Sequence, residues 1–265
     1  MCGIVGYVGT PGQSKPALGV VIDALRRMEY RGYDSAGIAL LDGAGGMAVE
    51  KKAGKLDNLV AAVDAAKLDK YPATTGIGHT RWATHGRPTD SNAHPHVDHQ
   101  GKIAVVHNGI IENFAPLRAQ LEAEGVEFSS DTDSETVTHL LHAEYYGEGP
   151  NAGDFHASVM AVINKLEGAF TLVIAHADHP GTLMACRRST PLVIGVGDHQ
   201  MFLGSDVAAF IEHTREAVEL GQDNVVTITA DGYQITDFAG NPVEGRPFTI
   251  DWDLEAAEKG GYDYF

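Results

Sequence analysis

The alternation of hydrophobic and polar positions predicts strands and helices that occur in runs. In the first half of the chain, short β-branched segments bounded by Gly, Pro or Asp predict strands at residues 3–9, 36–41, 47–51, 75–80 and 102–107. One helix should follow the first strand, because Leu18, Val21, Leu25 and Met28 recur at helical spacing before Gly32. A second helix is expected at about residues 56–67.

The second half changes from helices to strands. Helices are predicted at residues 114–124, 134–146 and 155–166. Short strands should follow at 170–175, 182–187, 192–196 and 201–204, with a last hairpin at 224–228 and 233–236. Runs of strands and of helices, rather than strict alternation, favour an α+β fold with largely antiparallel sheets. Residues 84–101 have no periodicity and predict a long loop of functional importance.

Composition and charge narrow the possible partners. Of the 265 residues, 43% are hydrophobic and 21% charged, which is typical of a folded globular chain. The 19 Lys and Arg against 36 Asp and Glu give a net charge of −17, which would repel nucleic acid and anionic lipid. The sequence has no apolar stretch of about 18 residues and no secretory signal pattern, so we expect a cytoplasmic protein without membrane contact.

Cys2 is the first position that suggests chemistry. If Met1 is removed, Cys2 carries a thiol nucleophile and a free α-amine, and such an amine ordinarily titrates near pH 7.7 to 8.0. The α-amine could then act as the base that takes the proton from the thiol of the same residue. A small residue at position 2 also simply permits removal of the methionine, so position alone leaves both interpretations open.

Six blocks in one order resemble a known family. They are residues 2–6 (CGIVG), 29–37 (EYRGYDSAG), 79–86 (HTRWATHG), 92–96 (NAHPH), 107–113 (HNGIIEN) and 131–135 (DTDSE). Together they resemble the glutaminase domain of the glucosamine-6-phosphate synthases, which are class II glutamine amidotransferases. The resemblance implies an N-terminal-nucleophile hydrolase fold: a sandwich of four layers, αββα, with two mainly antiparallel sheets.

The same resemblance implies catalytic roles. Cys2 would attack the glutamine side-chain amide, and Asn108 and Gly109 would form the oxyanion hole, because residues 107–109 lie where a predicted strand ends and a turn begins. An ordinary Asn-Gly turn is the alternative interpretation. Arg31 and Gly32 would lie beside Cys2, where a guanidinium favours a thiolate.

Glutamine is a zwitterion, so a selective site needs one fixed cation and one fixed anion. By resemblance, Arg81 would bind the α-carboxylate and Asp133 the α-ammonium. Asp133 is also placed to cap the helix that follows. Trp82, Thr84 and His85 would belong to a loop that folds over glutamine, with Trp82 separating the site from an ammonia passage.

The resemblance extends to the whole enzyme. It implies no metal and no organic cofactor. It implies that ammonia passes to fructose 6-phosphate in a C-terminal sugar-phosphate isomerase domain, and that the full-length enzyme is a homo-oligomer. We expect one domain over residues 1–265, with dense motifs in 2–215; residues 216–265 would form a closing hairpin and an exit segment toward that second domain.

Three alternatives remain open. The spacing of His94, His96, Asp98 and His99 matches the H-x-H-x-D-H pattern of two-zinc hydrolases. A binding module could keep the glutamine pocket without turnover. Amidophosphoribosyltransferase and asparagine synthetase share the Cys-Gly start and a similar oxyanion turn, although residues 31–37 and 79–86 fit the hexosamine enzyme better.

Overall fold

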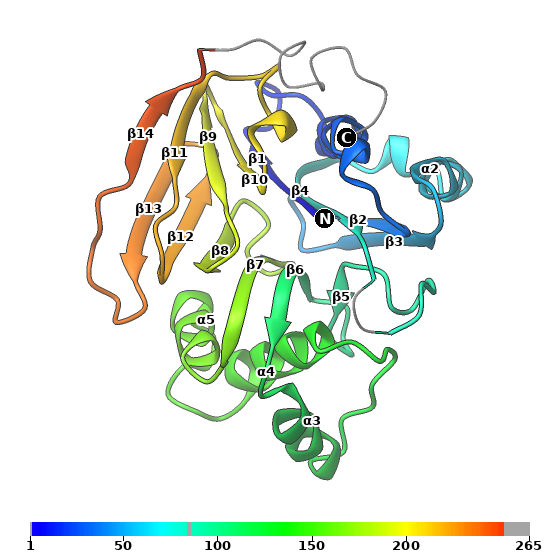
Figure 1. The fold of residues 1–265 in the computed structure, drawn as a ribbon, viewed down its shortest axis with the longest axis vertical. Coiled ribbons are helices and arrows are strands. Elements are labelled where there is room, and N and C mark those ends of the chain that lie inside the picture. Colours follow the sequence, from blue (N-terminus) through cyan, green and yellow to red (C-terminus); the bar gives the residue numbers. More distant parts are fainter. Residues whose placement is uncertain (1, 84–85, 252–265) are drawn as a thin grey trace.

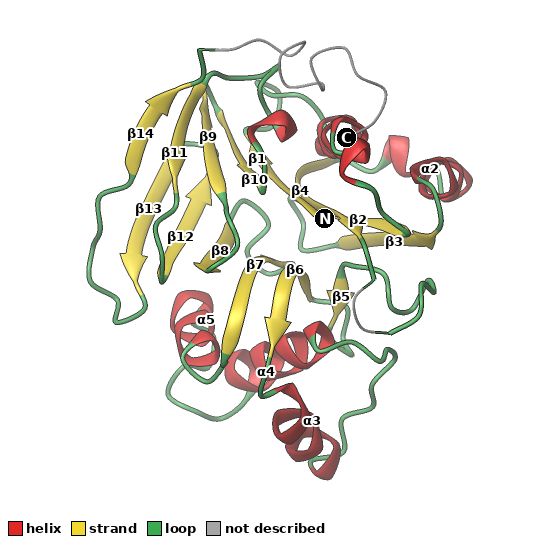
Figure 2. Ribbon diagram, viewed as in Figure 1, coloured by secondary structure: helices red, strands yellow, loops and turns green. Residues whose placement is uncertain are grey.

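Two antiparallel sheets packed face to face form the centre of the structure, a computed structural model that describes residues 2–83 and 86–251 (Figures 1 and 2). The first sheet has eight strands in the order β14 (Arg246–Thr249), β11 (Glu216–Glu219), β9 (Val193–Gly197), β10 (Gln200–Gly204), β1 (Gly3–Gly9), β4 (Ala73–Arg81), β2 (Ser35–Asp42) and β3 (Met47–Ala53). The second has six strands in the order β13 (Gly232–Asp237), β12 (Asn224–Thr229), β8 (Leu183–Arg188), β7 (Gly168–His176), β6 (Ile103–Ile111) and β5 (His96–Val97).

Helices cover the outer face of each sheet (Figure 2). On the eight-stranded sheet lie α1 (Ala17–Arg27) and α2 (Leu56–Ala65), with short 3₁₀ turns at Glu29–Arg31, Leu68–Lys70 and Val207–Ala209. The six-stranded sheet is covered by α4 (Ser134–Tyr146) and α5 (Phe155–Ile163), and α3 (Phe114–Ala123) packs beside α4. The order of layers is therefore αββα, as predicted.

Strand alternation explains why three separate apolar layers form. In β1, Ile4 and Val8 point between the sheets, whereas Val5 and Tyr7 point toward α1. Both faces of β1 are buried, and the strand lies between β10 and β4 in the middle of its sheet. Because β1 is central, the residue that precedes it, Cys2, lies at the end of the strand where the two sheets meet.

Several predicted elements need correction. β6 does not end at His107: it continues through Asn108 and Gly109, which pair with Thr171 and Phe170 of β7, so neither a strand end nor an Asn-Gly hairpin occurs there. The loop predicted at 84–101 contains the short strand β5. Two further strands, β11 and β14, were not predicted, and α5 ends at Ile163 rather than residue 166.

No helix among residues 2–83 and 86–251 is long and apolar enough to cross a membrane. The predicted exit segment at residues 252–262 lies outside the described residues, as does Met1.

Candidate active site

Cys2 is held at the start of β1 by contacts from the end of β4 and from the segment that follows β10. The Gly3 N–H donates to Thr80 Oγ1 at 3.2 Å, and the Ile4 N–H donates to Ser205 Oγ at 3.0 Å. The Cys2 sulfur accepts from the Trp82 N–H at 3.2 Å. A β-carbon at Gly3 would lie 2.7 Å from Thr80 Oγ1, so glycine permits this close approach. The sulfur is thus fixed relative to the end of β4.

The Asn108 amide spans the space between Cys2 and the neighbouring sheet. Its Nδ2 donates to the Cys2 carbonyl at 3.3 Å, and its Oδ1 lies 2.9 Å from His79 Nε2. The Thr190 hydroxyl donates to the Asn108 carbonyl at 3.3 Å. An amide with donors directed to the Cys2 end is the arrangement that an oxyanion hole requires.

Gly109 has a backbone that other residues rarely adopt. Its φ is +127°, and a β-carbon there would lie 2.0 Å from the Ala169 carbonyl oxygen. Only glycine therefore fits this position in β6. It lines the same pocket as Cys2.

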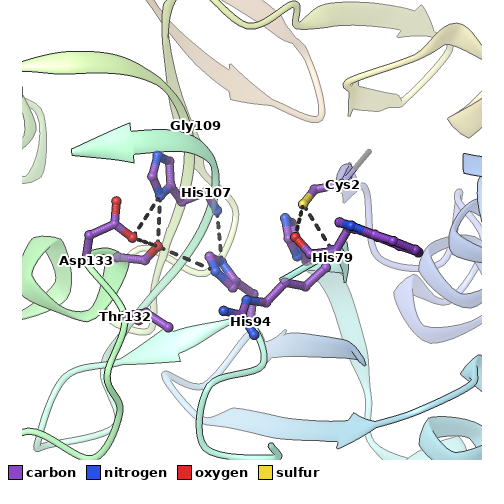
Figure 3. Close-up of a pocket in the computed structure, with 10 residues that line it drawn as sticks. Cys2, His79, His94, His107, Gly109, Thr132 and Asp133 are labelled. Atoms are coloured by element: carbon purple, nitrogen blue, oxygen red, sulfur yellow. Dashed lines mark hydrogen bonds and ion pairs between the residues drawn. The ribbon is translucent and has the colours of Figure 1, made fainter. Parts of the chain in front are cut away.

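Arg81 and Asp133 supply opposite charges to one narrow pocket of about 40 Å³ that also contains Cys2 and Gly109. Arg81 is the last residue of β4 and is buried, and Asp133 directly precedes α4. Figure 3 shows Cys2 on one side of this pocket and Asp133 on the other, with His94 and His107 between them. The pocket therefore has a thiol at one end and a carboxylate at the other.

Asp133 does not cap α4 through its side chain, which corrects that prediction. Its Oδ2 accepts instead from the Ile111 N–H of β6 at 2.8 Å, and its Oδ1 accepts from the Ser134 hydroxyl at 3.2 Å. Ser134 Oγ in turn lies 2.8 Å from His107 Nδ1. These contacts orient the carboxylate toward the pocket rather than along the helix axis.

Buried histidines form the wall behind these groups. His79 stacks on His94 with ring centroids 4.3 Å apart, and His94 Nδ1 accepts from the His107 N–H at 3.1 Å. Burial lowers the pKa of His79 to about 3 and also lowers the pKa of His94, His96 and His107. All four rings are therefore neutral at pH 7, which leaves Arg81 and Asp133 as the formally charged side chains among the described residues that line the pocket.

These depressed pKa values predict that acid destabilises the fold. An unfolded histidine binds its proton near pH 6.5, whereas folded His79 stays neutral until about pH 3. The contribution of His79 to the free energy of unfolding is therefore fully present above pH 6.5 and is lost as the pH falls below that value. His79 alone should lower the free energy of unfolding by about 2 kcal/mol between pH 7 and pH 5. Urea unfolding at pH 7, 6 and 5 measures this. His79→Gln should reduce the pH dependence, whereas Asn58→Ala, which removes an exposed amide of α2 that does not titrate, should leave it unchanged.

Arg31 lines a second, larger and mainly apolar cavity of about 900 Å³ together with Cys2, Trp82 and Asn108, and Gly32 follows it against the Trp82 ring. Arg31 Nη1 lies 3.3 Å from Asp206 Oδ2, so its charge is shared with a carboxylate. Gly32 has φ +73° and its Cα faces the Trp82 ring, and the Trp82 residue is 53% exposed. Trp82 lines both the narrow pocket and this larger cavity, as do Cys2 and Gly109.

Thr84 and His85 lie outside the described residues. The loop that returns from them is tied to the site, because Arg81 Nη2 donates to the Gly86 carbonyl at 3.4 Å. Asn92 further along exchanges hydrogen bonds with Asp131, two residues before Asp133.

The zinc interpretation of residues 94–99 is not supported. His94 Nδ1 accepts from a backbone N–H, and Asp98 accepts from Lys102 and Ile103 N–H groups and contacts His142 at 2.6 Å. Across the described ranges 2–83 and 86–251, no three His, Cys, Asp or Glu side chains are grouped to hold a metal ion.

Sequence reasoning gave no role in a glutamine site to five residues that line the narrow pocket. They are His79, His94, His107, Thr132 and Ser134. All five stand inside the blocks quoted above, which is the signal that could have found them. Their convergence depends on the sheets being packed face to face, which no local pattern shows.

Comparison with known proteins supports this picture. Residues 79–212, half of the chain, match the family described as "Glutamine amidotransferase domain". The chain is 67% identical to the glutamine–fructose-6-phosphate aminotransferase (isomerizing) of Mycolicibacterium smegmatis and 65% identical to that of Mycolicibacterium paratuberculosis. It is covered completely in both alignments but spans only 43% and 42% of these relatives' own lengths.

A solved structure shares the fold. Glutamine phosphoribosylpyrophosphate amidotransferase from B. subtilis matches with a TM-score of 0.72 over 91% of this chain and 50% of that chain, at 24% sequence identity. The predicted fold class, a sandwich of two antiparallel sheets between helical layers, is thereby confirmed.

Proposed function

Because the chain belongs to the family of glutamine amidotransferase domains, we propose that it hydrolyses L-glutamine to glutamate and ammonia with Cys2 as the nucleophile. The observation that carries this proposal is the position of the Cys2 sulfur in one pocket with Arg81, Asp133 and Gly109, beside the Asn108 amide. A thiol, two opposite charges and an amide donor are the groups that selective cleavage of glutamine requires.

The proposed reaction has two steps. With Met1 removed, the α-amine of Cys2 takes the thiol proton as the sulfur attacks the glutamine amide carbon. Asn108 Nδ2 and the Gly109 N–H stabilise the oxyanion. Ammonia leaves with a proton from the amine, and a γ-glutamyl thioester remains. Water then attacks the thioester, which releases glutamate and restores the thiol.

The charged groups select the substrate in this scheme. Arg81 binds the α-carboxylate and Asp133 the α-ammonium, with Ile111 and Ser134 holding the Asp133 carboxylate. Arg31 and Gly32 form the corner beside Cys2. Trp82, Thr84 and His85 would contribute to glutamine binding, and Trp82 would separate the pocket from the larger cavity, through which ammonia would leave.

Hydrolysis of glutamine by the purified chain tests the proposal directly. Glutamate and ammonia should appear in equal amounts, and asparagine should be a poor substrate because its shorter side chain cannot reach Cys2 while Arg81 and Asp133 hold its α-groups. Release of ammonia from glutamine that persists after the thiol has been blocked would contradict the proposal.

We predict that Arg81→Ala raises KM for glutamine about tenfold to a hundredfold. The reason is the loss of a charge-assisted, bidentate contact, which contributes about 1.5 to 3 kcal/mol. Steady-state kinetics with glutamine measures the change. Arg246→Ala is the matched control, since that side chain is 83% exposed on the edge strand β14. An unchanged KM in Arg81→Ala would remove this residue from the binding site.

For the whole protein we propose the activity that its relatives' name states. The chain covers less than half of these relatives, so the remainder would hold a sugar-phosphate isomerase domain that uses the ammonia to convert fructose 6-phosphate to glucosamine 6-phosphate. The full-length enzyme would be a cytoplasmic homo-oligomer, and the present chain would form its single glutaminase domain.

A further inference from the structure

His79 lies at a position where the inner face of one sheet meets the other. In β4 it follows Ile77 by two residues, so both side chains point between the sheets. The His79 ring is fully buried and crosses this layer to reach Asn108 of β6. A buried polar contact is costly unless it is satisfied, so its geometry is tightly set.

The Asn108 amide has two chemically different ends. One end carries two N–H donors and the other a carbonyl oxygen, and rotation of the amide by half a turn exchanges them. Only one orientation places a donor where the oxyanion of the proposed reaction forms. The other orientation would place an oxygen lone pair there and repel the developing charge.

Contacts at both ends select the useful orientation. The Cys2 carbonyl can only accept, and Asn108 Nδ2 lies 3.3 Å from it. Oδ1 is thereby directed to His79 Nε2 at 2.9 Å, which must carry the single proton of this neutral ring. A hydrogen bond accepted at Oδ1 also polarises the amide and strengthens its N–H donors.

The His79 ring is itself fixed in place. It stacks on His94 at 4.3 Å, and His94 is anchored by the His107 N–H, the residue next to Asn108. The ring and the amide that it contacts are therefore held by the same segment of β6.

We propose that His79 is a positioning residue for the oxyanion hole: its Nε2–H holds the Asn108 amide with the NH₂ group toward the reacting carbonyl. The proposal rests on the proposed glutaminase function. His79 does not touch the substrate in this scheme, and it acts only through Asn108. Its loss should therefore lower kcat and leave KM for glutamine nearly unchanged.

A double-mutant cycle tests this. His79→Leu should lower kcat about tenfold or more in the otherwise native chain but less than about twofold in the Asn108→Ala background. His79→Gln offers an amide donor in place of the imidazole N–H and should recover most of the lost kcat. His176→Leu is the matched control: this histidine is equally buried and is the last residue of β7, where it pairs with Ile103 rather than with Asn108.

The position of the proton on the His79 ring can be measured in the native chain, which tests the proposal without any substitution. The ¹⁵N shifts of the His79 ring should show the proton on Nε2 and none on Nδ1. A proton on Nδ1, an equal loss of kcat in both backgrounds, or a His79→Gln variant as slow as His79→Leu would each overturn the proposal. A native chain without Cys2-dependent turnover would instead overturn the proposed function, and this inference with it.

Discussion

Cys2→Ala should reduce glutamine hydrolysis more than about a thousandfold, because a thioester needs a thiol and Cys2 is the only cysteine among the described residues that line the pocket. The histidines of the pocket wall are neutral and buried, and Ser134 is buried and in contact with His107 and Asp133. Cys2→Ser should be nearly as inactive, since a hydroxyl is a much weaker nucleophile than a thiol at neutral pH. Steady-state assays of ammonia release measure both losses.

Cys186→Ala is the matched control for that experiment. Burial raises the pKa of the Cys186 thiol to about 12, so it is inert, and its removal should leave turnover unchanged. Intact-mass analysis with an electrophilic glutamine analogue should show one adduct in the native chain and in Cys186→Ala, and none in Cys2→Ala. The same spectra should show the loss of Met1. Full activity in Cys2→Ala, or an adduct on Cys186, would refute the assignment of the nucleophile.

Asn108→Ala should lower kcat about 10² to 10³-fold while KM for glutamine changes little. The side chain contributes a donor to the oxyanion but no contact to the α-carboxylate or α-ammonium in the proposed scheme. Measuring kcat and KM separately is therefore essential, because a general loss of structure would change both.

A suitable comparison is Asn58→Ala, which removes an amide that donates to the Ala53 carbonyl at 2.9 Å, on α2 and away from the pocket. It should lower stability slightly and leave kcat unchanged. If Asn108→Ala raised KM and left kcat intact, Asn108 would be a binding residue and the oxyanion role would be wrong.

The sequence predicted much of the fold because most strands carry their own signal. β1 is short, β-branched and followed by a turn, and α1 carries a clear apolar stripe. β14 could not be predicted in this way: its residues are all exposed, it contains Pro247, and it exists only through pairing with β11. Pairing of this kind depends on a distant segment rather than on local pattern.

The error at residues 108–109 has the same origin. Asn-Gly is a strong local turn signal, but nine residues of β6 pair in register with β7, and that pairing overrides the local preference. The site residues that the resemblance named are placed in or beside one pocket, apart from Thr84 and His85, which lie outside the described residues. The contact between His79 and Asn108 was not predictable, because it joins two sheets whose packing no single segment encodes.

The central place of β1 has a consequence for how the protein is made. One neighbour, β4, leaves the ribosome about seventy residues after β1, but the other, β10, is separated from it by almost two hundred residues. During synthesis the edge of β1 that pairs with β10 therefore stays unpaired until most of the chain has emerged. The segment around Cys2 stays accessible throughout that interval, so the removal of Met1 that the proposed mechanism requires can be completed before the sheet closes around Cys2.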